Sequence, residues 1–239
     1  MQGMKEKIMA DHNLSTWARI SGFIYFIVIA TGIFSLMYVP SEITVKGDAA
    51  ATIANIRSHE TMYRSGIAAL LINQIAFFLL PLALYVLLAP TNRLVAQIMV
   101  LAALIGIPLG LASAAERIFL IELLTSKISV SPQAVLDLVA VSRARANEAL
   151  MIATTFWGLW LLPFGYLVFR SGCLPRVLGI FLMAGCVGYL VNLFGLIMVP
   201  NFSELTIASI VRVPATIGEI GIGLWLLLIG IRTPKIAPG

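Results

Sequence analysis

Apolar residues occur along this chain in six long runs, and most polar residues lie in the segments between them. A helix of about 20 apolar residues is long enough to cross the roughly 30 Å hydrocarbon core of a bilayer. Helices are favoured there because the backbone must satisfy its hydrogen bonds within its own segment. The pattern therefore predicts an all-α, six-span transmembrane helical bundle. The expected spans cover residues 17–39, 64–88, 94–120, 148–169, 177–199 and 212–231.

A short apolar phrase recurs in three of the runs, at 76–83, 158–165 and 223–230. Each copy begins and ends with a small residue and contains an aromatic residue followed by Leu-Leu. The other three runs begin alike, with an Arg followed three residues later by Gly or Ala. A small residue near the start of a span lets a neighbouring helix approach closely. We predict three repeated helical hairpins within a single integral-membrane domain, 1–239.

The segments 40–63 and 121–147 are expected to be outer loops with structure of their own. In the first, Asp48 is a suitable N-cap for a short helix, and Ser58 is a suitable cap for the second span. In the second, Ser131 precedes Pro132, which is the usual order of a cap and a first-position proline. The mostly apolar residues after Pro132 predict a helix lying in the membrane interface. A lid over a site is the alternative interpretation of that helix.

Basic residues set the expected orientation of the chain. On one side they are concentrated in the tight links 89–93 and 170–176 and at both ends of the chain, including Arg232 and Lys235. On the other side they are mixed with acidic residues in longer loops. Cytoplasmic segments carry an excess of Lys and Arg, so both termini are expected to be cytoplasmic. No A-x-A site closes the first apolar run, so we expect that run to be retained.

Composition supports the same class of protein. Hydrophobic residues make up 60% of the 239 residues and charged residues 11%, whereas soluble domains carry roughly 25% charged residues. The lipid bilayer is therefore the expected main partner. A net charge of +5 is also typical of nucleic-acid binding, but many of these basic residues lie at the ends of apolar runs, where they anchor helices. We expect no nucleic-acid partner.

Polar side chains inside the apolar runs are the first place to look for function, because they are costly in lipid. At the helical rise, Glu219 lies about 10 Å inward from Arg212, and Asn73 lies about 14 Å inward from Arg64. The predicted ligand-binding residues are Glu219, Asn73, Gln74, Asn192, Arg117, Glu116, Glu148 and Arg212. They are expected to lie toward the outer side and to form a polar vestibule. The alternative is a structural network in which Glu219 pairs with Arg117 or Arg212 and the amide side chains bond one helix to another.

No set of residues specifies a reaction. The only histidines, His12 and His59, are not part of an H-E-x-x-H motif, and the chain has no phosphate-binding G-x-x-x-x-G-K-[ST] loop. We therefore expect no catalytic residues, no metal and no cofactor.

Three functions follow as hypotheses. The first is binding or passage of a small solute or ion through the vestibule. The second is an accessory protein that packs against a membrane partner or a second copy of itself. Its expected contact faces carry Gly179, Gly185, Gly188, Gly218, Gly221 and Gly223. The third is an enzyme acting on a lipid, with Glu148 or Glu219 as general base.

Two stretches of the sequence resemble a known family. One runs from Gly47 to Ile56 and continues to Gly66, and the other runs from Phe156 to Leu190. The position of Glu219 ahead of the last apolar phrase also fits. The chain resembles the bacterial multipass membrane family known as domain of unknown function 4386. That resemblance implies a polytopic protein of the bacterial inner membrane, and it brings no activity, substrate or catalytic residue with it.

Overall fold

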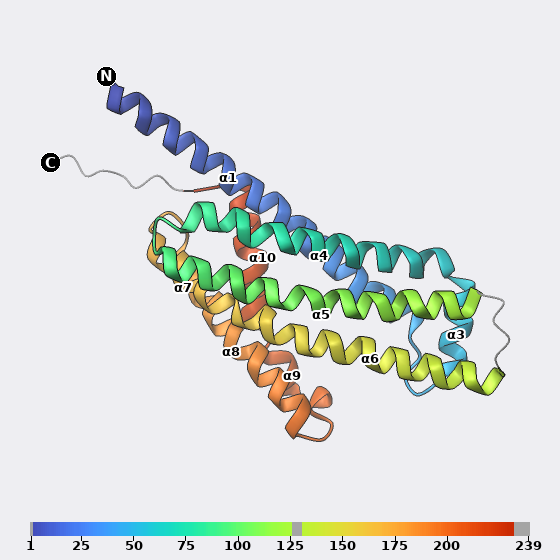
Figure 1. The fold of residues 1–239 in the computed structure, drawn as a ribbon. Helices are drawn as coiled ribbons and strands as arrows, with labels where there is room; N and C mark the ends of the chain where they lie inside the picture. Colours follow the sequence, from blue (N-terminus) through green and yellow to red (C-terminus); the bar gives the residue numbers. More distant parts are fainter. Residues whose placement is uncertain (1, 126–130, 232–239) are drawn as a thin grey trace. The chain divides into compact units, whose positions relative to one another are not determined.

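The computed structural model describes residues 2–125 and 131–231, with side chains from Asn13 onward. Every regular element in this part of the chain is a helix (Figure 1). The elements are α1 (Gln2–Ile33), η1 (Phe34–Tyr38), α2 (Val39–Ile43), α3 (Ala49–Ser58), α4 (Glu60–Leu88), α5 (Arg93–Thr125), α6 (Pro132–Leu159), α7 (Leu161–Ser171), α8 (Arg176–Met198), η2 (Phe202–Glu204), α9 (Thr206–Ile210) and α10 (Val213–Leu228).

Within the residues that the structure describes, six stretches of helix are long and apolar enough to cross a membrane. They are Asn13–Ile43, Glu60–Leu88, Arg93–Thr125, Pro132–Ser171, Arg176–Met198 and Thr206–Leu228. The predicted all-α bundle with six spans is therefore confirmed. The three-hairpin repeat and the cytoplasmic termini stay predictions. Arg232 and Lys235, which entered the argument on orientation, lie outside the described residues.

The chain divides into two compact units, which we describe separately. Unit 1 comprises Met1–Phe26, Phe77–Gly106 and Thr154–Gly239. Unit 2 comprises Ile27–Ala76 and Ile107–Ala153. Four helices, α1, α4, α5 and α6, each contribute residues to both units.

Unit 1 is built around a cluster of aromatic rings. Trp160 is fully buried, and its ring stacks on Phe164 with centroids 5.0 Å apart. Phe77 meets Trp160 edge-on at 5.3 Å, and Tyr25 lies 6.3 Å from the same ring. Aromatic pairs in such geometries contribute about 0.5–1.5 kcal/mol each beyond the burial of their area. The cluster therefore joins α1 and α4 to the region where α6 passes into α7.

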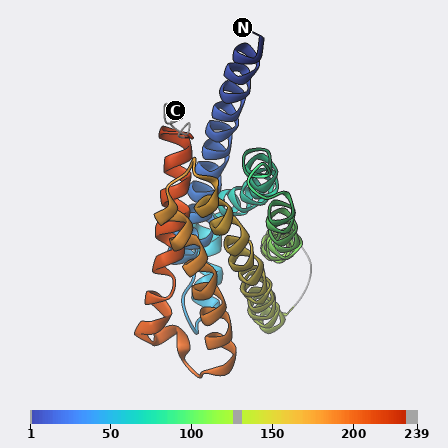
Figure 2. The ribbon, with the colours of Figure 1, turned by 90° about the vertical axis from the view of Figure 1, so that its left-hand side faces the viewer.

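Close helix contacts in unit 1 depend on glycine. Helix α8 packs against α7 and against α10, which lies beside it in Figure 2. A β-carbon on Gly165 would stand 2.6 Å from the carbonyl oxygen of Gly179, and one on Gly185 would stand 2.7 Å from the α-carbon of Ala215. Real β-carbons do not approach other atoms so closely. Only hydrogen at these positions allows the helices to approach to this distance.

These contacts correct one expectation about a protein partner. The small-residue faces of α8 and α10 were expected to be free for another membrane protein. Instead, Gly179, Gly185, Gly188, Gly218 and Gly221 each lie against another helix or link of this same chain. Gly223 is buried as well. Packing within the chain already uses the surfaces that the sequence suggested for a partner.

The break between α6 and α7 has a local cause. Helix α6 ends at Leu159 and α7 begins at Leu161, two residues before Pro163. Proline has no N–H to donate to the carbonyl four residues earlier, which is that of Leu159, and its ring clashes with that carbonyl. The continuous α-helical ladder therefore ends at this point, while the span continues to Ser171.

In the segment 40–63, one of the two predicted helix caps is confirmed and the other is wrong. The Asp48 cap is confirmed, since its Oδ1 accepts a hydrogen bond of 2.8 Å from the Ala51 N–H at the start of α3. The Ser58 cap is wrong, because Ser58 is the last residue of α3 and its hydroxyl donates to the Asn55 carbonyl.

The expectation of a separate interfacial helix after Pro132 is also wrong. The Ser131 hydroxyl does cap this helix, accepting from the Ala134 N–H at 3.2 Å. From Pro132, however, α6 runs without interruption to Leu159, so residues 132–147 belong to the helix of the fourth span. The sequence contains no Gly or Pro between Pro132 and Gly158, so nothing stops the helix earlier. Residues 126–130 of the predicted loop lie outside the described residues.

Replacing Gly22 by valine should destabilise unit 1. A β-carbon on Gly22 would lie 2.6 Å from the backbone atoms of Leu226 and Leu227, which cannot move without shifting α10. Overpacking of this kind costs about 1–3 kcal/mol in the free energy of unfolding. Thermal unfolding of the detergent-solubilised protein, followed by tryptophan fluorescence, measures the loss. Ala30→Val is the matched control, because Ala30 is exposed on the same helix. Equal melting temperatures for the two variants would contradict the close contact.

Candidate functional site

Unit 2 has a cavity of about 490 Å³ that is partly open to the surface. Its lining residues come from α2, α3, α4, α5, α6 and the link between α2 and α3. The volume falls within the roughly 300–1,000 Å³ that is typical of small-molecule sites. It is therefore the first place in unit 2 to look for a bound ligand.

The cavity is lined by three cations and by no carboxylate. Arg117 of α5 and Arg143 of α6 are half-buried, and Lys46 is exposed. Ion pairs within the described residues are Arg64–Glu60 and Arg145–Glu116, and neither involves a cation of the cavity. Three positive charges therefore surround one space without a lining acid to balance them. Partial burial strengthens their field, because less water screens it.

Arg117 is held in place by an irregular turn of helix. Residues Phe34–Tyr38 form a π-helical turn in which the Val39 N–H donates to the Phe34 carbonyl. The next residue, Pro40, has no N–H for the Ser35 carbonyl. Nη1 of Arg117 donates to that carbonyl oxygen at 3.3 Å. A guanidinium has five N–H donors, so this bond positions the group and leaves further donors for a ligand.

Arg143 is positioned by a buried threonine. Its Nη1 donates to Oγ1 of Thr52 at 3.2 Å. The same hydroxyl donates to the Asp48 carbonyl at 2.8 Å and accepts from the Val45 N–H at 3.1 Å. Thr52 therefore ties together α3, the link before it and α6. The guanidinium of Arg143 stands at the cavity on a fixed support.

The remaining wall of the cavity is largely apolar. Val39, Ile43 and Ile56 line it and are each 2% exposed. They belong to one hydrophobic cluster with Tyr63, which lines the cavity too. Leu120 and Ala146 complete the buried part of the lining. One space thus combines an apolar wall with three cationic groups.

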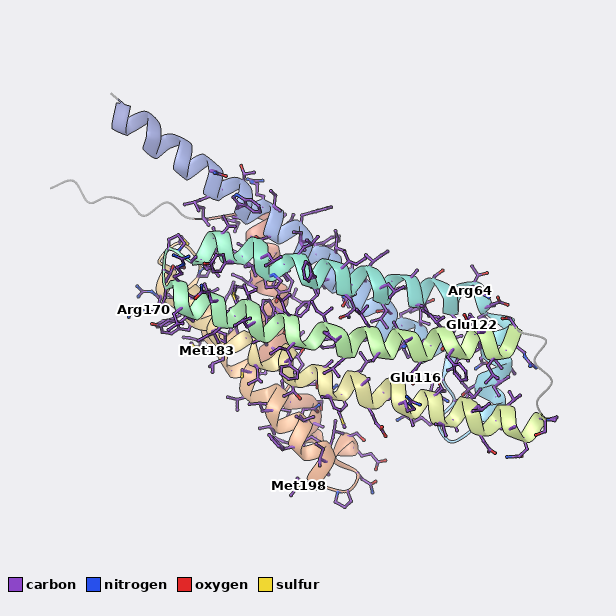
Figure 3. All side chains as sticks on the ribbon, in the orientation of Figure 1. Arg64, Glu116, Glu122, Arg170, Met183 and Met198 are labelled. Atoms are coloured by element: carbon purple, nitrogen blue, oxygen red, sulfur yellow. The ribbon has the colours of Figure 1, made fainter. Side chains whose placement is uncertain are left out.

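The two glutamates that the sequence grouped with Arg117 lie elsewhere. The carboxylate of Glu116, which Figure 3 labels on α5, accepts from the Ser142 hydroxyl at 2.8 Å and pairs with Nε of Arg145 at 2.9 Å. Glu148 is exposed on α6. Neither residue lines the cavity. Of the eight predicted ligand-binding residues, only Arg117 does.

Asn73 and Gln74 join helices in unit 2. Nδ2 of Asn73 donates to the Val28 carbonyl at 2.7 Å and to Oγ1 of Thr31 at 3.2 Å, which connects α4 to α1. Nε2 of Gln74 donates to Oδ1 of Asn73 at 3.3 Å. A β-carbon on Gly110 would lie 2.5 Å from Cδ of Gln74, so α5 packs directly on this amide. For these two residues the geometry supports the structural network.

The other three predicted residues belong to unit 1. Glu219 of α10 is half-buried and forms a side-chain hydrogen bond with Tyr189 of α8, a partner that the sequence did not suggest. Asn192 lies three residues further along α8 and is half-buried. Arg212 is exposed, and its Nε donates to the Ala208 carbonyl near the end of α9. The predicted vestibule combines residues of both units and stays a prediction.

Sequence reasoning missed most of the polar residues that line the cavity, notably Lys46, Thr52, Tyr63, Arg143 and Asn147. Arg143 and Asn147 are four residues apart, so they share one face of α6 together with Ala146. This shared face could be inferred from the sequence only if the segment after Pro132 was predicted to form one long helix with the fourth span. Thr52 gave no local signal, because its partner Arg143 lies 91 residues away.

Metal-ligating side chains are not grouped in the described part of the chain. No three of its His, Cys, Asp and Glu residues could hold one ion together. Cys173 and Cys186 are free thiols. The chemistry that the cavity itself offers is hydrogen bonding from cations beside an apolar wall.

Comparison with known proteins adds a family to this picture. Residues 20–230 match the family described as Domain of unknown function (DUF4386). No curated protein and no solved structure matches the chain. The family resemblance read from the sequence is therefore confirmed, and the description carries no activity.

Replacing Asn73 by leucine should lower the free energy of unfolding by about 1–3 kcal/mol. The change leaves Nε2 of Gln74, in a side chain that is 1% exposed, without its acceptor, and a buried donor without a partner is costly. Adding Gln74→Met removes that donor, so the double variant should regain at least half of the loss. Denaturant titration of the solubilised protein measures both variants. If the double variant loses as much free energy of unfolding as Asn73→Leu and Gln74→Met lose in sum, the Asn73–Gln74 hydrogen bond is contradicted.

Proposed function

The chain belongs to the family described as Domain of unknown function (DUF4386), and on that premise we propose that this member binds a small anion in the cavity of unit 2. The family description assigns no activity, so the proposal depends on the site alone. The observation that carries it is the set of three lining cations, Arg117, Arg143 and Lys46, with no Asp or Glu among the lining residues.

Electrostatics favour an anion at this position. Opposite unit charges 4 Å apart attract by about 4 kcal/mol at an effective dielectric constant of 20. The three cations repel one another, and a bound anion would offset that repulsion with attraction. The guanidinium fork also matches the geometry of carboxylate and phosphate oxygens. The two half-buried arginines, Arg117 and Arg143, are therefore the principal binding residues.

The proposal narrows the broader prediction of a solute or ion. The proposal concerns ligand binding, because the cavity and its cations all belong to unit 2. It includes no transport across the membrane. The membrane location follows from the six apolar spans. The basic links 89–93 and 170–176 support placing the cavity on the outer side of a bacterial inner membrane.

Inorganic phosphate should raise the melting temperature of the wild-type protein in detergent at constant ionic strength, since a ligand that binds only the folded state stabilises it. Arg143→Gln should weaken phosphate binding about ten- to hundredfold, the value of a hydrogen bond to a charged group. Arg145→Gln is the matched control, because Arg145 pairs with Glu116 and does not line the cavity.

Two results would contradict anion binding at this site. One is a wild-type melting temperature that phosphate leaves unchanged. The other is an equal loss of phosphate affinity in Arg143→Gln and Arg145→Gln, which would indicate an effect of net charge rather than of the cavity.

A further inference from the structure

The volume of the cavity restricts the class of ligand further than the positive charge of its lining does. A space of about 490 Å³ falls in the range that is typical of sites for organic molecules, and an inorganic anion held by the cations would fill only a small part of it. Seven of the fourteen lining residues are apolar, so the rest of the space is poorly suited to water alone. The space fits an anion that carries an organic body.

The polar and apolar linings also differ in their access to solvent. Ser41, Lys46 and Asn147 are exposed lining residues, and Arg143 is half-buried. Val39, Ile43, Ile56 and Leu120 are each at most 2% exposed. The exposed lining is therefore polar and cationic, whereas the more buried lining is mainly apolar and includes Pro40 and Tyr63 beside the polar Thr52. A ligand that matches both parts has a charged end and an apolar end.

We propose that the ligand is an amphipathic organic anion, with its carboxylate or phosphate on Arg117, Arg143 and Lys46 and its hydrocarbon part against the apolar lining around Pro40 and Tyr63. This inference rests on the proposed function and adds the class of ligand to it. Two sources share this chemistry: an acidic lipid of the surrounding membrane and a water-soluble organic acid. Both present one anionic group attached to a hydrocarbon part.

Ala146 provides a way to test the apolar part alone. It is a buried lining residue of α6, one turn from Arg143. A larger aliphatic side chain there would occupy space that the hydrocarbon part needs, while the cations stay in place. Ala144 on the same helix is exposed and does not line the cavity, so Ala144→Leu is a matched control for the added side chain.

The experiment uses the full chain in phosphatidylcholine nanodiscs and measures binding of inorganic phosphate and of propyl, butyl, pentyl and hexyl phosphate by calorimetry. Empty nanodiscs give the background. Affinity should rise about fourfold per methylene, which is the effect of burying one methylene group. Ala146→Leu should flatten this rise, whereas Ala144→Leu should keep it. Ala146→Val serves as the smaller change if Ala146→Leu does not fold.

The outcomes separate this inference from the proposed function. Binding of inorganic phosphate with no gain along the alkyl series overturns the amphipathic ligand and leaves anion binding intact. An alkyl gain that Ala146→Leu, or Ala146→Val in its place, leaves unchanged also overturns it, because the chain then binds elsewhere. Absence of binding by every phosphate in the series overturns both.

A final arm identifies the source of the ligand once the alkyl gain is found. Binding of hexyl phosphate is measured again in nanodiscs that contain phosphatidic acid. Loss of binding supports an acidic membrane lipid, because the lipid then already occupies the cavity. Unchanged binding supports a water-soluble organic acid.

Discussion

A backbone surrounded by apolar groups must find its hydrogen-bond partners within the protein, and this constraint positions the central cation of the site. Pro40 leaves the Ser35 carbonyl without the N–H that a π-helical turn would supply, and the Arg117 guanidinium donates to that oxygen instead. A charged side chain is thereby held beside the space that Val39 and Ile43 line. The position of the Arg117 guanidinium thus follows from a carbonyl that Pro40 leaves without its N–H.

Close approach of helices is the second constraint, and it determines how the rest of the chain can be used. Lipid tails are as apolar as leucine, so helices in a membrane associate through packing and hydrogen bonds. In unit 1 the glycines of α8 and α10 meet their own neighbours, as Gly185 meets Ala215. In unit 2 the Asn73 amide bridges α4 to α1. These glycines and this amide therefore act as joints between helices of the same unit.

The sequence predicted the fold well because the length of an apolar run is a local property that the bilayer sets directly. Of the residues that line the cavity, the sequence singled out Arg117 alone, and the reasons are physical. Glu116 and Arg117 are neighbours in sequence, but successive side chains on a helix point about 100° apart, so only Arg117 reaches the cavity. Arg143 was assigned to a loop because the start of α6 was separated from its span. The Thr52–Arg143 bond joins residues that only the folded chain brings together.

The charges of the cavity exceed what its architecture requires. Arg117 satisfies a carbonyl and Arg143 supports a hydroxyl, and in each bond one N–H is enough. A neutral amide side chain also has N–H donors, without the cost of a partly buried charge. No Asp or Glu lies among the lining residues, and the carboxylate of Glu116 pairs with Arg145 instead. Cations that exceed what their own hydrogen bonds need, with no lining acid to neutralise them, leave charge available for a ligand, and this surplus supports the proposal of binding over a purely structural role.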